Sequence, residues 1–490
     1  MRSRVLIADL PRWVDPAAVF SELLNSADSA AGAIWLDSGV SATTGRSYLA
    51  LSQRAVLSTD LTEPVFDWMR REFAVPDVDV SGAPEGFCLG WVGWLGYELR
   101  GESLGVPITK PAETPDAAWL WVDRALVFDH TSQSLSLLAL GESWTAELAQ
   151  WRDDMAALVA AAVEARYPAV PAAQEPQSQP ATAAQAPPAT AAQAPPATAA
   201  QPQAHSPRSA TPPPPSAIWR DSDADYLAMI AACQSAITEG DAYQLCLTTS
   251  VHVDEVADPV ATYLALRAAN PSHHGGFMRV GETALLSSTP EQFLSIDPSG
   301  LIETKPIKGT RGRGADQNDD DRLAAELLAS DKERAENLMI VDLMRNDLGR
   351  VCEVGSVTVP KLFDVESYAT VHQLVSTIRG QLRPEVSAVD AIKASFPAGS
   401  MTGAPKHSAT LILDSLERAP RGIYSGVFGY VGLDGSVDLA MVIRSIVMDA
   451  RGSTIGAGGG ITALSVPAEE LAEVKLKAAA LLRVLGVPAD

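Results

Sequence analysis

Lys308 lies in the run Thr304–Arg311, between Pro306 and Gly309, in a chain that is otherwise acidic. Proline and glycine favour tight turns, and a lysine held in such a turn can act as a covalent nucleophile once its amine has lost a proton. The alternative is an ordinary solvated charge, which is the usual state of a lysine. The motifs in the rest of the chain favour the nucleophile.

Two pairs of glutamates have the spacing of a single helix face. Glu333 and Glu336 follow a helix-capping signal, and Glu470 and Glu473 follow a proline that is typical of a helix start. Two such helices can offer carboxylates to one hard divalent cation, and Mg²⁺ prefers oxygen ligands. A solvated helix face is the alternative for each pair, and Lys477 can instead form a salt bridge with Glu473.

Two glycine-rich segments flank an apolar strand that ends in arginine. Segment 396–406 leads into a helix from about Ser408, and we expect segment 456–462 to be a turn that follows a strand. The backbone N–H groups of glycine turns can hold a carboxylate. Arg444 ends the apolar strand 439–444, and its planar guanidinium suits bidentate carboxylate binding. These features predict a site for an anionic substrate.

The composition excludes several classes of protein. The 490 residues carry a formal charge of −23 without a basic run, which argues against nucleic acid as a partner. No apolar run reaches the length of a membrane span, and the N-terminus lacks a secretory signal pattern, so a cytoplasmic location is expected. The four cysteines are scattered, which predicts neither a zinc site nor a disulfide framework.

The chain divides into three segments. We predict a first domain over residues 1–170, with strands in the runs 5–7, 33–36 and 125–128 and a helix over 144–167. Residues 171–216 are rich in Pro, Ala, Gln and Thr and predict an extended, disordered linker. Residues 217–490 open with a helix at 223–238, alternate strands and helices, and carry most of the chemistry.

Cys88 lies in Gly86–Gly90, a run superficially similar to the nucleophile turn of glutamine amidotransferases. Trp91 stands where a glutamine would follow, and no His-x-Glu motif occurs downstream. The run is therefore expected to be a packed strand and turn. We expect no glutaminase site in this chain.

The segment after the linker resembles the chorismate-utilising enzymes along its whole length. The first 170 residues are similar to them chiefly through Gly90–Leu99. The resemblance implies an α+β fold, with two large antiparallel sheets packed as a core sandwich, helices outside, and contributions from both halves of the chain. The matching stretches after the linker are 241–248, 288–291, 303–311, 335–347, 396–406, 424–430 and 456–477.

Two positions narrow the implied activity. Family members that add water to chorismate carry a lysine base where this chain has Gln244. Members that aminate ring carbon C2 usually have alanine where this chain has Lys308, whereas members that aminate C4 usually have lysine. The resemblance therefore implies that ammonia replaces the C4 hydroxyl of chorismate, towards p-aminobenzoate and folate. Gly312 departs from the family pattern, which commonly has proline there.

The resemblance also implies roles for individual residues. Lys308 is the expected nucleophile, and Glu291 is the expected general acid that protonates the departing hydroxyl. The expected Mg²⁺ ligands are Glu336 and Glu470, with Glu333 and Glu473 in direct or indirect contact with the ion. The residues expected to bind chorismate are Gln244, His372, Thr402, Tyr424, Arg444, Gly458, Gly459, Gly460 and Lys477.

Ammonia needs a source, and the resemblance implies a separate glutamine amidotransferase subunit. Two alternatives remain open. One is amination at C2, as in anthranilate synthase component I or 2-amino-2-deoxyisochorismate synthase. The other is a non-catalytic regulatory protein that binds chorismate or tryptophan, and the intact set of Lys308, Glu291 and the glutamate pairs argues against it.

Overall fold

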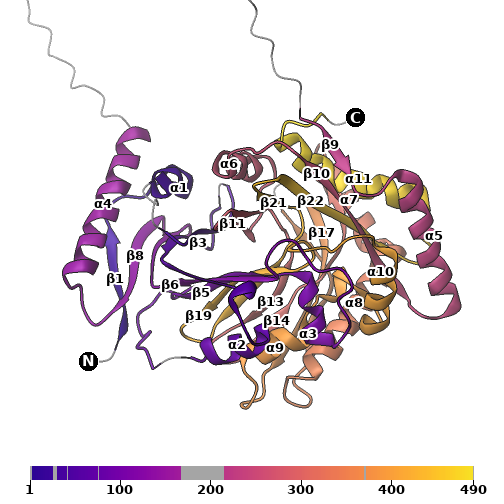
Figure 1. The fold of residues 1–490 in the computed structure, drawn as a ribbon, viewed down its shortest axis with the longest axis horizontal. Helices are drawn as coiled ribbons and strands as arrows, with labels where there is room; N and C mark the ends of the chain where they lie inside the picture. The colour runs from indigo at the N-terminus through magenta and orange to yellow at the C-terminus, as the bar shows by residue number, and fades with distance from the viewer. Residues whose placement is uncertain are drawn as a thin grey trace, which may run out of the picture.

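The computed structural model describes residues 3–25, 30–40, 42–75, 77–166, 215–368 and 371–488. The predicted linker lies outside these residues, apart from its last two positions. Two large antiparallel sheets form the centre of the molecule, and helices cover their outer faces (Figure 1). The predicted α+β sandwich is therefore confirmed. No helix in the described part of the chain is long and apolar enough to cross a membrane.

The larger sheet has 12 strands. Their spatial order is β1 (Arg4–Leu10), β8 (Ser134–Gly141), β7 (Arg124–Asp129), β3 (Arg46–Ser52), β2 (Gly32–Asp37), β11 (Gly275–Val280), β12 (Thr283–Ser287), β21 (Ser445–Asp449), β22 (Gly452–Ile461), β10 (Gln244–Val253) and β18 (Gly403–Ala404), and β9 (Ala217–Trp219) also pairs with β10.

The smaller sheet has 10 strands. Their spatial order is β15 (Ile307–Gly312), β17 (Val371–Gln381), β14 (Leu301–Thr304), β13 (Gln292–Ile296), β20 (Val437–Met441), β19 (Val427–Gly432), β5 (Gly90–Leu95), β6 (Ala117–Val122) and β4 (Arg54–Leu57), and β16 (Thr358–Ser367) also pairs with β17.

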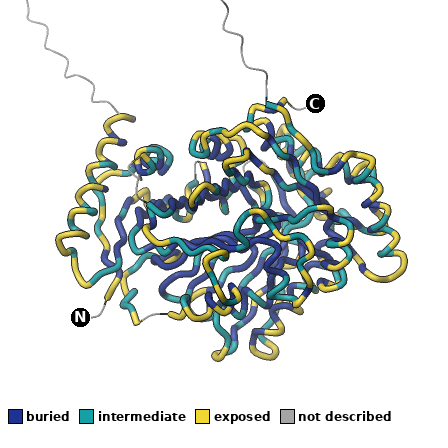
Figure 2. Tube along the Cα trace, in the orientation of Figure 1, coloured by how far each residue is buried: buried dark blue, intermediate teal, exposed yellow. Residues whose placement is uncertain are grey.

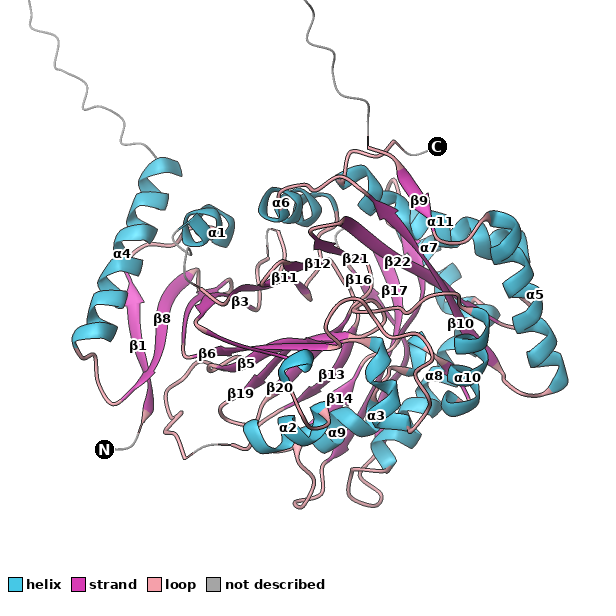
Figure 3. Ribbon diagram, in the orientation of Figure 1, coloured by secondary structure: helices cyan, strands magenta, loops and turns pink. Residues whose placement is uncertain are grey.

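The helices divide between the outer faces of the two sheets (Figure 3). Those packed on the larger sheet are α1 (Pro16–Asn25), α4 (Ala146–Arg166), α5 (Asp223–Glu239), α6 (Pro259–Ala269), α10 (Lys406–Leu416) and α11 (Pro467–Val484). Those packed on the smaller sheet are α2 (Val65–Glu72), α8 (Asp331–Gly349) and α9 (Ala388–Ser395). The remaining helices are α3 (Arg100–Leu104), α7 (Gln317–Ala329) and the 3-10 turns η1 (Ser58–Asp60), η2 (Tyr97–Leu99) and η3 (Gly399–Met401).

Neighbouring residues of one strand enter different cores, because side chains alternate between the two faces of a sheet. On β2, Ile34 packs between the sheets, whereas Trp35 packs under the helices of the larger sheet. On β6, Leu120 joins the core between the sheets, and Trp119 packs on the outer side of the smaller sheet. Burial is accordingly concentrated along the strands, and exposure on the surrounding helices and loops (Figure 2).

Both halves of the chain supply strands to both sheets. In the larger sheet β2 pairs with β11, and in the smaller sheet β5 pairs with β19. The predicted boundary at 171–216 therefore separates segments of sequence, and residues 1–170 and 217–490 are parts of one folded unit rather than two domains. A change in composition marks where the chain leaves the core, but it does not reveal which strands exchange hydrogen bonds.

The local predictions agree with the structure except around the glycines. The predicted strands lie in β1, β2 and β7, and the helices over 144–167 and 223–238 correspond to α4 and α5. The prediction of a turn at 456–462 was wrong, because residues 456–461 form the end of β22 and only Thr462 lies beyond it. The apolar strand predicted to end at Arg444 ends at Met441, and the helix predicted from about Ser408 begins at Lys406.

Candidate active site

A cavity of about 600 Å³ lies where β10 and β22 of the larger sheet meet β15 of the smaller sheet, with α8 and α11 along its wall. Most of the residues predicted for the site line this cavity, although they are far apart in the sequence. They are Glu291, Lys308, Glu333, Glu336, Tyr424, Arg444, Gly458, Gly459, Gly460, Glu470, Glu473 and Lys477.

Lys308 lies on a β-bulge rather than in the predicted turn. β15 pairs with β17 on either side of Lys308 and Gly309, and the register shifts between them. Gly309 has a φ of +84°, which glycine adopts without the steric penalty that other residues meet. Bulges re-aim side chains next to active sites. Here the Lys308 amine points towards β22 and lies 3.6 Å from where a Cβ on Gly460 would stand.

Glu291 lies just before β13, and only 7% of it is exposed. Burial raises the pKa of its carboxyl to about 7, against the opposing effects of the Lys308 ammonium and of hydrogen bonds from Ser400 and the backbone of Ile307. A carboxyl with this pKa is partly protonated at neutral pH and can therefore serve as a general acid.

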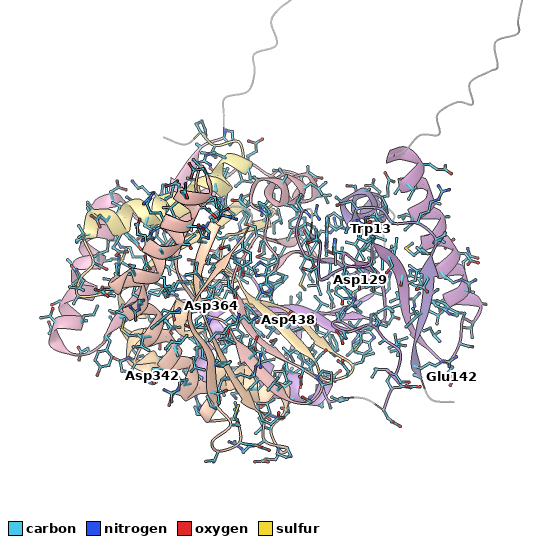
Figure 4. The ribbon with its side chains drawn as sticks, turned by 180° about the vertical axis from the view of Figure 1, so that it is seen from behind. Trp13, Asp129, Glu142, Asp342, Asp364 and Asp438 are labelled. Atoms are coloured by element: carbon cyan, nitrogen blue, oxygen red, sulfur yellow. The ribbon has the colours of Figure 1, made fainter. Side chains whose placement is uncertain are left out.

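The neighbour of Glu291, Gln292, has a different environment. Its Nε2 donates a hydrogen bond of 3.0 Å to Asp438, which lies near the middle of the molecule (Figure 4). Asp438 does not line the cavity, which Glu291 does. The start of β13 therefore directs the Glu291 side chain to this cavity and the Gln292 side chain to Asp438, which lines a second cavity.

The glutamates of α8 and α11 reach the cavity from two sides. Glu336 and Glu470 are buried, at 8% and 3% exposure, whereas Asp342, further along α8, lies at the periphery (Figure 4). Burial raises the pKa of Glu336, the ammonium of Lys308 opposes the shift, and the charge of Glu333 adds to it. An added cation would relieve this accumulation of negative charge.

The fit of this cluster to Mg²⁺ rests on two carboxylates rather than four. Among the described residues, no group of three or more His, Cys, Asp or Glu side chains is arranged to hold an ion. Glu473 instead pairs with Lys477 at 2.7 Å, and Glu333 lies 3.6 Å from Arg311. Because Mg²⁺ often binds one or two carboxylates and completes its shell with water and substrate oxygens, Glu336 and Glu470 still suit it.

The glycines of β22 form one wall of the cavity as a strand. Thr248 and Cys246 of β10, which lie opposite Gly458 and Gly460, turn their peptide N–H groups away from β22, towards Glu417 and Thr402. The peptide N–H and C=O groups of Gly458 and Gly460 therefore point away from β10. Lys477 Nζ donates a hydrogen bond of 2.9 Å to the Gly458 carbonyl. Of the three predicted N–H donors, Gly459 points into the ladder instead.

Three further side chains line the cavity beside the open edge of β22: Tyr424, Arg444 and Lys477. Arg444 has a φ of 49°, and its carbonyl accepts hydrogen bonds from both the N–H and the hydroxyl of Ser288, in the loop that leads to Glu291. The Tyr424 ring packs so closely on Gly456 that a Cβ there would lie 2.1 Å from it. Only glycine at this position leaves room for the ring.

Three predicted substrate-binding residues do not line the cavity. Thr402 is fully buried, and its hydroxyl donates to the Ala398 carbonyl at 3.1 Å. His372 places its ring nitrogens 2.7 Å from Ser367 and 2.9 Å from Asp320, away from the cavity. The Gln244 amide lies behind Gly460, 2.3 Å from the position of a Cβ on that glycine, and its buried Oε1 lacks a hydrogen-bond partner. The structure thus gives Thr402 and His372 supporting positions.

Two residues of the cavity were missed at the level of sequence. Ser400 lines the cavity from η3 and lowers the pKa of Glu291, and it lies inside the glycine-rich segment that the sequence did single out. Lys332, at the start of α8, lies 3.5 Å from Glu470. Its charged neighbours, Glu470 first among them, raise its pKa although burial opposes this. Its spacing from Glu333 and Glu336 gave no signal of this contact.

The fold is a sandwich of two antiparallel sheets, and its cavity brings an amine and a protonatable carboxyl into the same space. The chain belongs to the chorismate binding enzyme family, whose model matches residues 33–483.

Similar proteins include an aminodeoxychorismate synthase and an anthranilate synthase component 1. The chain is 40% identical over 506 residues to the aminodeoxychorismate synthase of Streptomyces griseus, covering 99% of this chain and 64% of that protein. It is 41% identical over 265 residues to anthranilate synthase component 1 of Methanothermobacter thermautotrophicus, covering 54% of this chain and 57% of that protein. The chain thus spans less than two thirds of the length of either relative.

A solved structure has the same fold. Anthranilate synthase component I from Streptococcus pneumoniae TIGR4 superimposes with a TM-score of 0.67 at 24% identity, over 97% of this chain and 92% of that one. This similarity concerns the arrangement of the sheets and helices.

Proposed function

We propose that this protein converts chorismate and ammonia into 4-amino-4-deoxychorismate and water. The observation that carries the proposal is the placement of the Lys308 amine and the Glu291 carboxyl in one cavity, with burial raising the pKa of Glu291 to about 7. The reaction needs both a nucleophile and a proton donor, because hydroxide is a poor leaving group. The similarity to aminodeoxychorismate synthase supports the same activity.

The reaction proceeds in two displacements. The neutral Lys308 amine bonds to ring C2, the ring double bonds shift, and the C4–O bond breaks as Glu291 gives its proton to the departing hydroxyl, which leaves as water. Ammonia then bonds to C4, the double bonds shift back, and the C2–N bond breaks to release Lys308. One proton of the ammonium formed at C4 returns to Glu291. A covalent intermediate divides one difficult substitution into two easier steps.

The remaining cavity residues bind and orient the substrate. The guanidinium of Arg444 and the outward N–H groups of Gly458 and Gly460 are donors for the enolpyruvyl carboxylate. Glu336 and Glu470 would hold Mg²⁺, which supplies charge neutralisation for the ring carboxylate when it is bound. Lys477, fixed by Glu473 and the Gly458 carbonyl, adds positive charge at the same edge.

Ammonia is proposed to come from a separate glutamine amidotransferase. The cysteine in this chain that is superficially similar to an amidotransferase nucleophile, Cys88, is 1% exposed, and burial raises the pKa of its thiol to about 12. A buried neutral thiol does not attack glutamine. The isolated chain should therefore use ammonium and not glutamine.

The test combines product identification with a variant of the nucleophile. Wild-type protein with chorismate, ammonium and Mg²⁺ should yield the C4-aminated product by chromatography, and removal of divalent ions by chelation should slow it. Lys308→Ala should abolish the product while keeping the folded-state circular dichroism, and intact-protein mass spectrometry should detect an adduct in the wild type alone. Full activity of Lys308→Ala would refute the covalent step.

A second candidate is amination at C2, which the similarity to anthranilate synthase component 1 favours. The same assay distinguishes the two, because the C2-aminated product separates from the C4-aminated product on chromatography and, if it also loses pyruvate, gives fluorescent anthranilate. Anthranilate as the main product would replace the proposed function with this one.

A further inference from the structure

Arg421 is buried behind the cavity and uses all of its guanidinium nitrogens. Its Nε and Nη2 donate to the two carboxylate oxygens of Glu417 at 2.9 and 2.7 Å. Its Nη1 donates to the Met401 carbonyl at 2.6 Å, and Nη2 also donates to the Cys246 carbonyl at 2.9 Å. The side chain is 1% exposed. A planar guanidinium can satisfy this set of acceptors at once, and a lysine cannot.

Both backbone carbonyls belong to residues that line the cavity. Met401 ends the η3 turn, next to Ser400, which lines the cavity together with Glu291. Cys246 lies on β10 opposite Gly460. Arg421 therefore ties the turn that carries Ser400 to the strand behind the glycine wall, although it does not line the cavity itself.

The N-terminal half of the chain holds Arg421 in this position. The Tyr97 ring packs under its guanidinium at 4.2 Å, and the Tyr97 hydroxyl has no hydrogen-bond partner among the residues that the structure describes. The two oxygens of Glu98 accept the backbone N–H groups of Arg421 and Gly422 at 3.0 and 2.9 Å. Tyr97 and Glu98 lie in Gly90–Leu99, the part of the first 170 residues with the clearest family resemblance. Neither of them contacts the cavity.

We propose that Arg421 is a positioning residue of the active site, held by Tyr97 and Glu98, which fixes the Met401 and Cys246 carbonyls and so keeps Ser400 against Glu291. Residues from both halves of the chain, Tyr97 and Glu98 from the first and Arg421 from the second, thus support the same side of the cavity. The inference rests on the proposed function for its kinetic readout, but the geometry of Ser400 and Glu291 can be tested without turnover.

The main variants are Arg421→Lys and Tyr97→Leu. Each should lower kcat for C4 amination on the order of 10- to 100-fold, because small displacements of catalytic groups are costly, with KM for chorismate changing much less. Since the Ser400 hydrogen bond lowers the pKa of Glu291, its loss should move the basic limb of the pH–rate profile to higher pH. Ser400→Ala should move the limb in the same direction.

Two controls separate positioning from stability. The first control is Arg267→Lys, at another buried arginine, which lies away from the cavity. The Arg267 guanidinium donates to both carboxylate oxygens of Asp37 and to the Gly39 carbonyl, and it lies 4.8 Å from the centre of the Trp35 ring. Arg267→Lys should lose about as much stability as Arg421→Lys, and the basic limb of its pH–rate profile should stay where it is in the wild type. Tyr97→Phe keeps the ring and removes only an unpartnered hydroxyl, so it should match the wild type.

A measurement without substrate keeps the inference independent of the reaction. Infrared titration of the Glu291 carboxyl band, identified by its loss in Glu291→Gln, should show a higher midpoint in Arg421→Lys than in wild type and Arg267→Lys. If wild type does not turn over chorismate, the proposed function fails while this titration still tests Arg421. Equal midpoints and equal pH limbs in Arg421→Lys and Arg267→Lys would overturn the positioning role.

Discussion

Lys308 and Glu291, the proposed nucleophile and general acid, line the same cavity but differ in their local backbone and burial. Lys308 is turned by a bulge into the cavity, which the carboxylates of Glu336 and Glu470 also line. Glu291 is held almost out of contact with water, so its neutral form is favoured. One residue can thus donate a proton in the space where the other bonds to the substrate.

Replacing Gly309 should test the bulge. Gly309→Ala places a methyl group at a φ of +84° and 2.9 Å from the carboxyl group of Glu333, so we expect a loss of stability of about 1–2 kcal/mol and a much larger loss of activity. Gly312→Ala, on the same strand, adds a Cβ that meets nothing within 4 Å and should leave both unchanged. Urea denaturation and C4-amination rates measure the two effects. Equal behaviour of the two variants would contradict the role of the bulge.

Glu291 also predicts a pH dependence of stability. Its pKa is about 7 in the folded protein and near the ordinary 4.5 when unfolded, so between these values the folded state keeps a proton that the unfolded state releases. The contribution of the neutral carboxyl is fully present below about pH 4.5 and is lost as the pH rises through about 7. The difference corresponds to about 3 kcal/mol.

Glu291→Gln should remove this dependence. Relative to wild type, the variant should gain on the order of 3 kcal/mol of stability on going from pH 5 to pH 8, measured by urea denaturation at each pH. It should also lose activity by 10²- to 10⁴-fold, the usual contribution of a general acid. Parallel stability curves for the two proteins would show that Glu291 ionises as readily as a surface glutamate.

Among the secondary-structure elements, a buried ion pair fixes α8 relative to α10. Lys406 Nζ lies 2.6 Å from the Asp347 carboxylate and 2.8 Å from the Ser395 carbonyl, and both charged residues are at most 7% exposed. The pair sets the distance between the helix that carries Glu336 and the segment that carries Ser400. It therefore supports the site from outside the cavity.

Lys406→Met should destabilise the protein by about 3–5 kcal/mol, because it leaves the Asp347 charge buried without a partner. The double variant Asp347→Asn with Lys406→Met removes both charges and should recover much of this loss. Unfolding by urea at neutral pH measures both. A double variant as unstable as the single one would mean that packing, rather than charge, makes Lys406 necessary.

For the whole molecule, the exchange of strands between the two halves has a direct consequence. Residues 217–490 alone would expose the edges of β11 and β19 that normally pair with β2 and β5. Unpaired central strands recruit other chains, so this fragment should aggregate when expressed alone. Co-expressed with residues 1–170, it should form a soluble complex that co-elutes on size exclusion. A monomeric, folded 217–490 fragment would contradict the single folded unit.

The sequence alone determined which residue types carry the chemistry. Lys308 and the glutamates at i, i+3 spacing could be proposed as site residues from local patterns, and Glu291 from the family resemblance, and all of them line the cavity. The strands in 33–36 and 125–128 and the long helices were predictable for the same reason. Composition likewise located the break at 171–216.

Only the tertiary structure decided how these residues meet. Gly458 to Gly460 form a strand because β10 lies against them, and His372 is engaged by Asp320 across two elements, neither of which a local pattern encodes. The role of Arg421 depends on acceptors that lie from 4 to 323 residues away along the chain. Hydrogen bonds and packing between distant segments are set by the global topology. Local sequence patterns therefore indicated the candidate side chains, and only the fold decided which of them lie together.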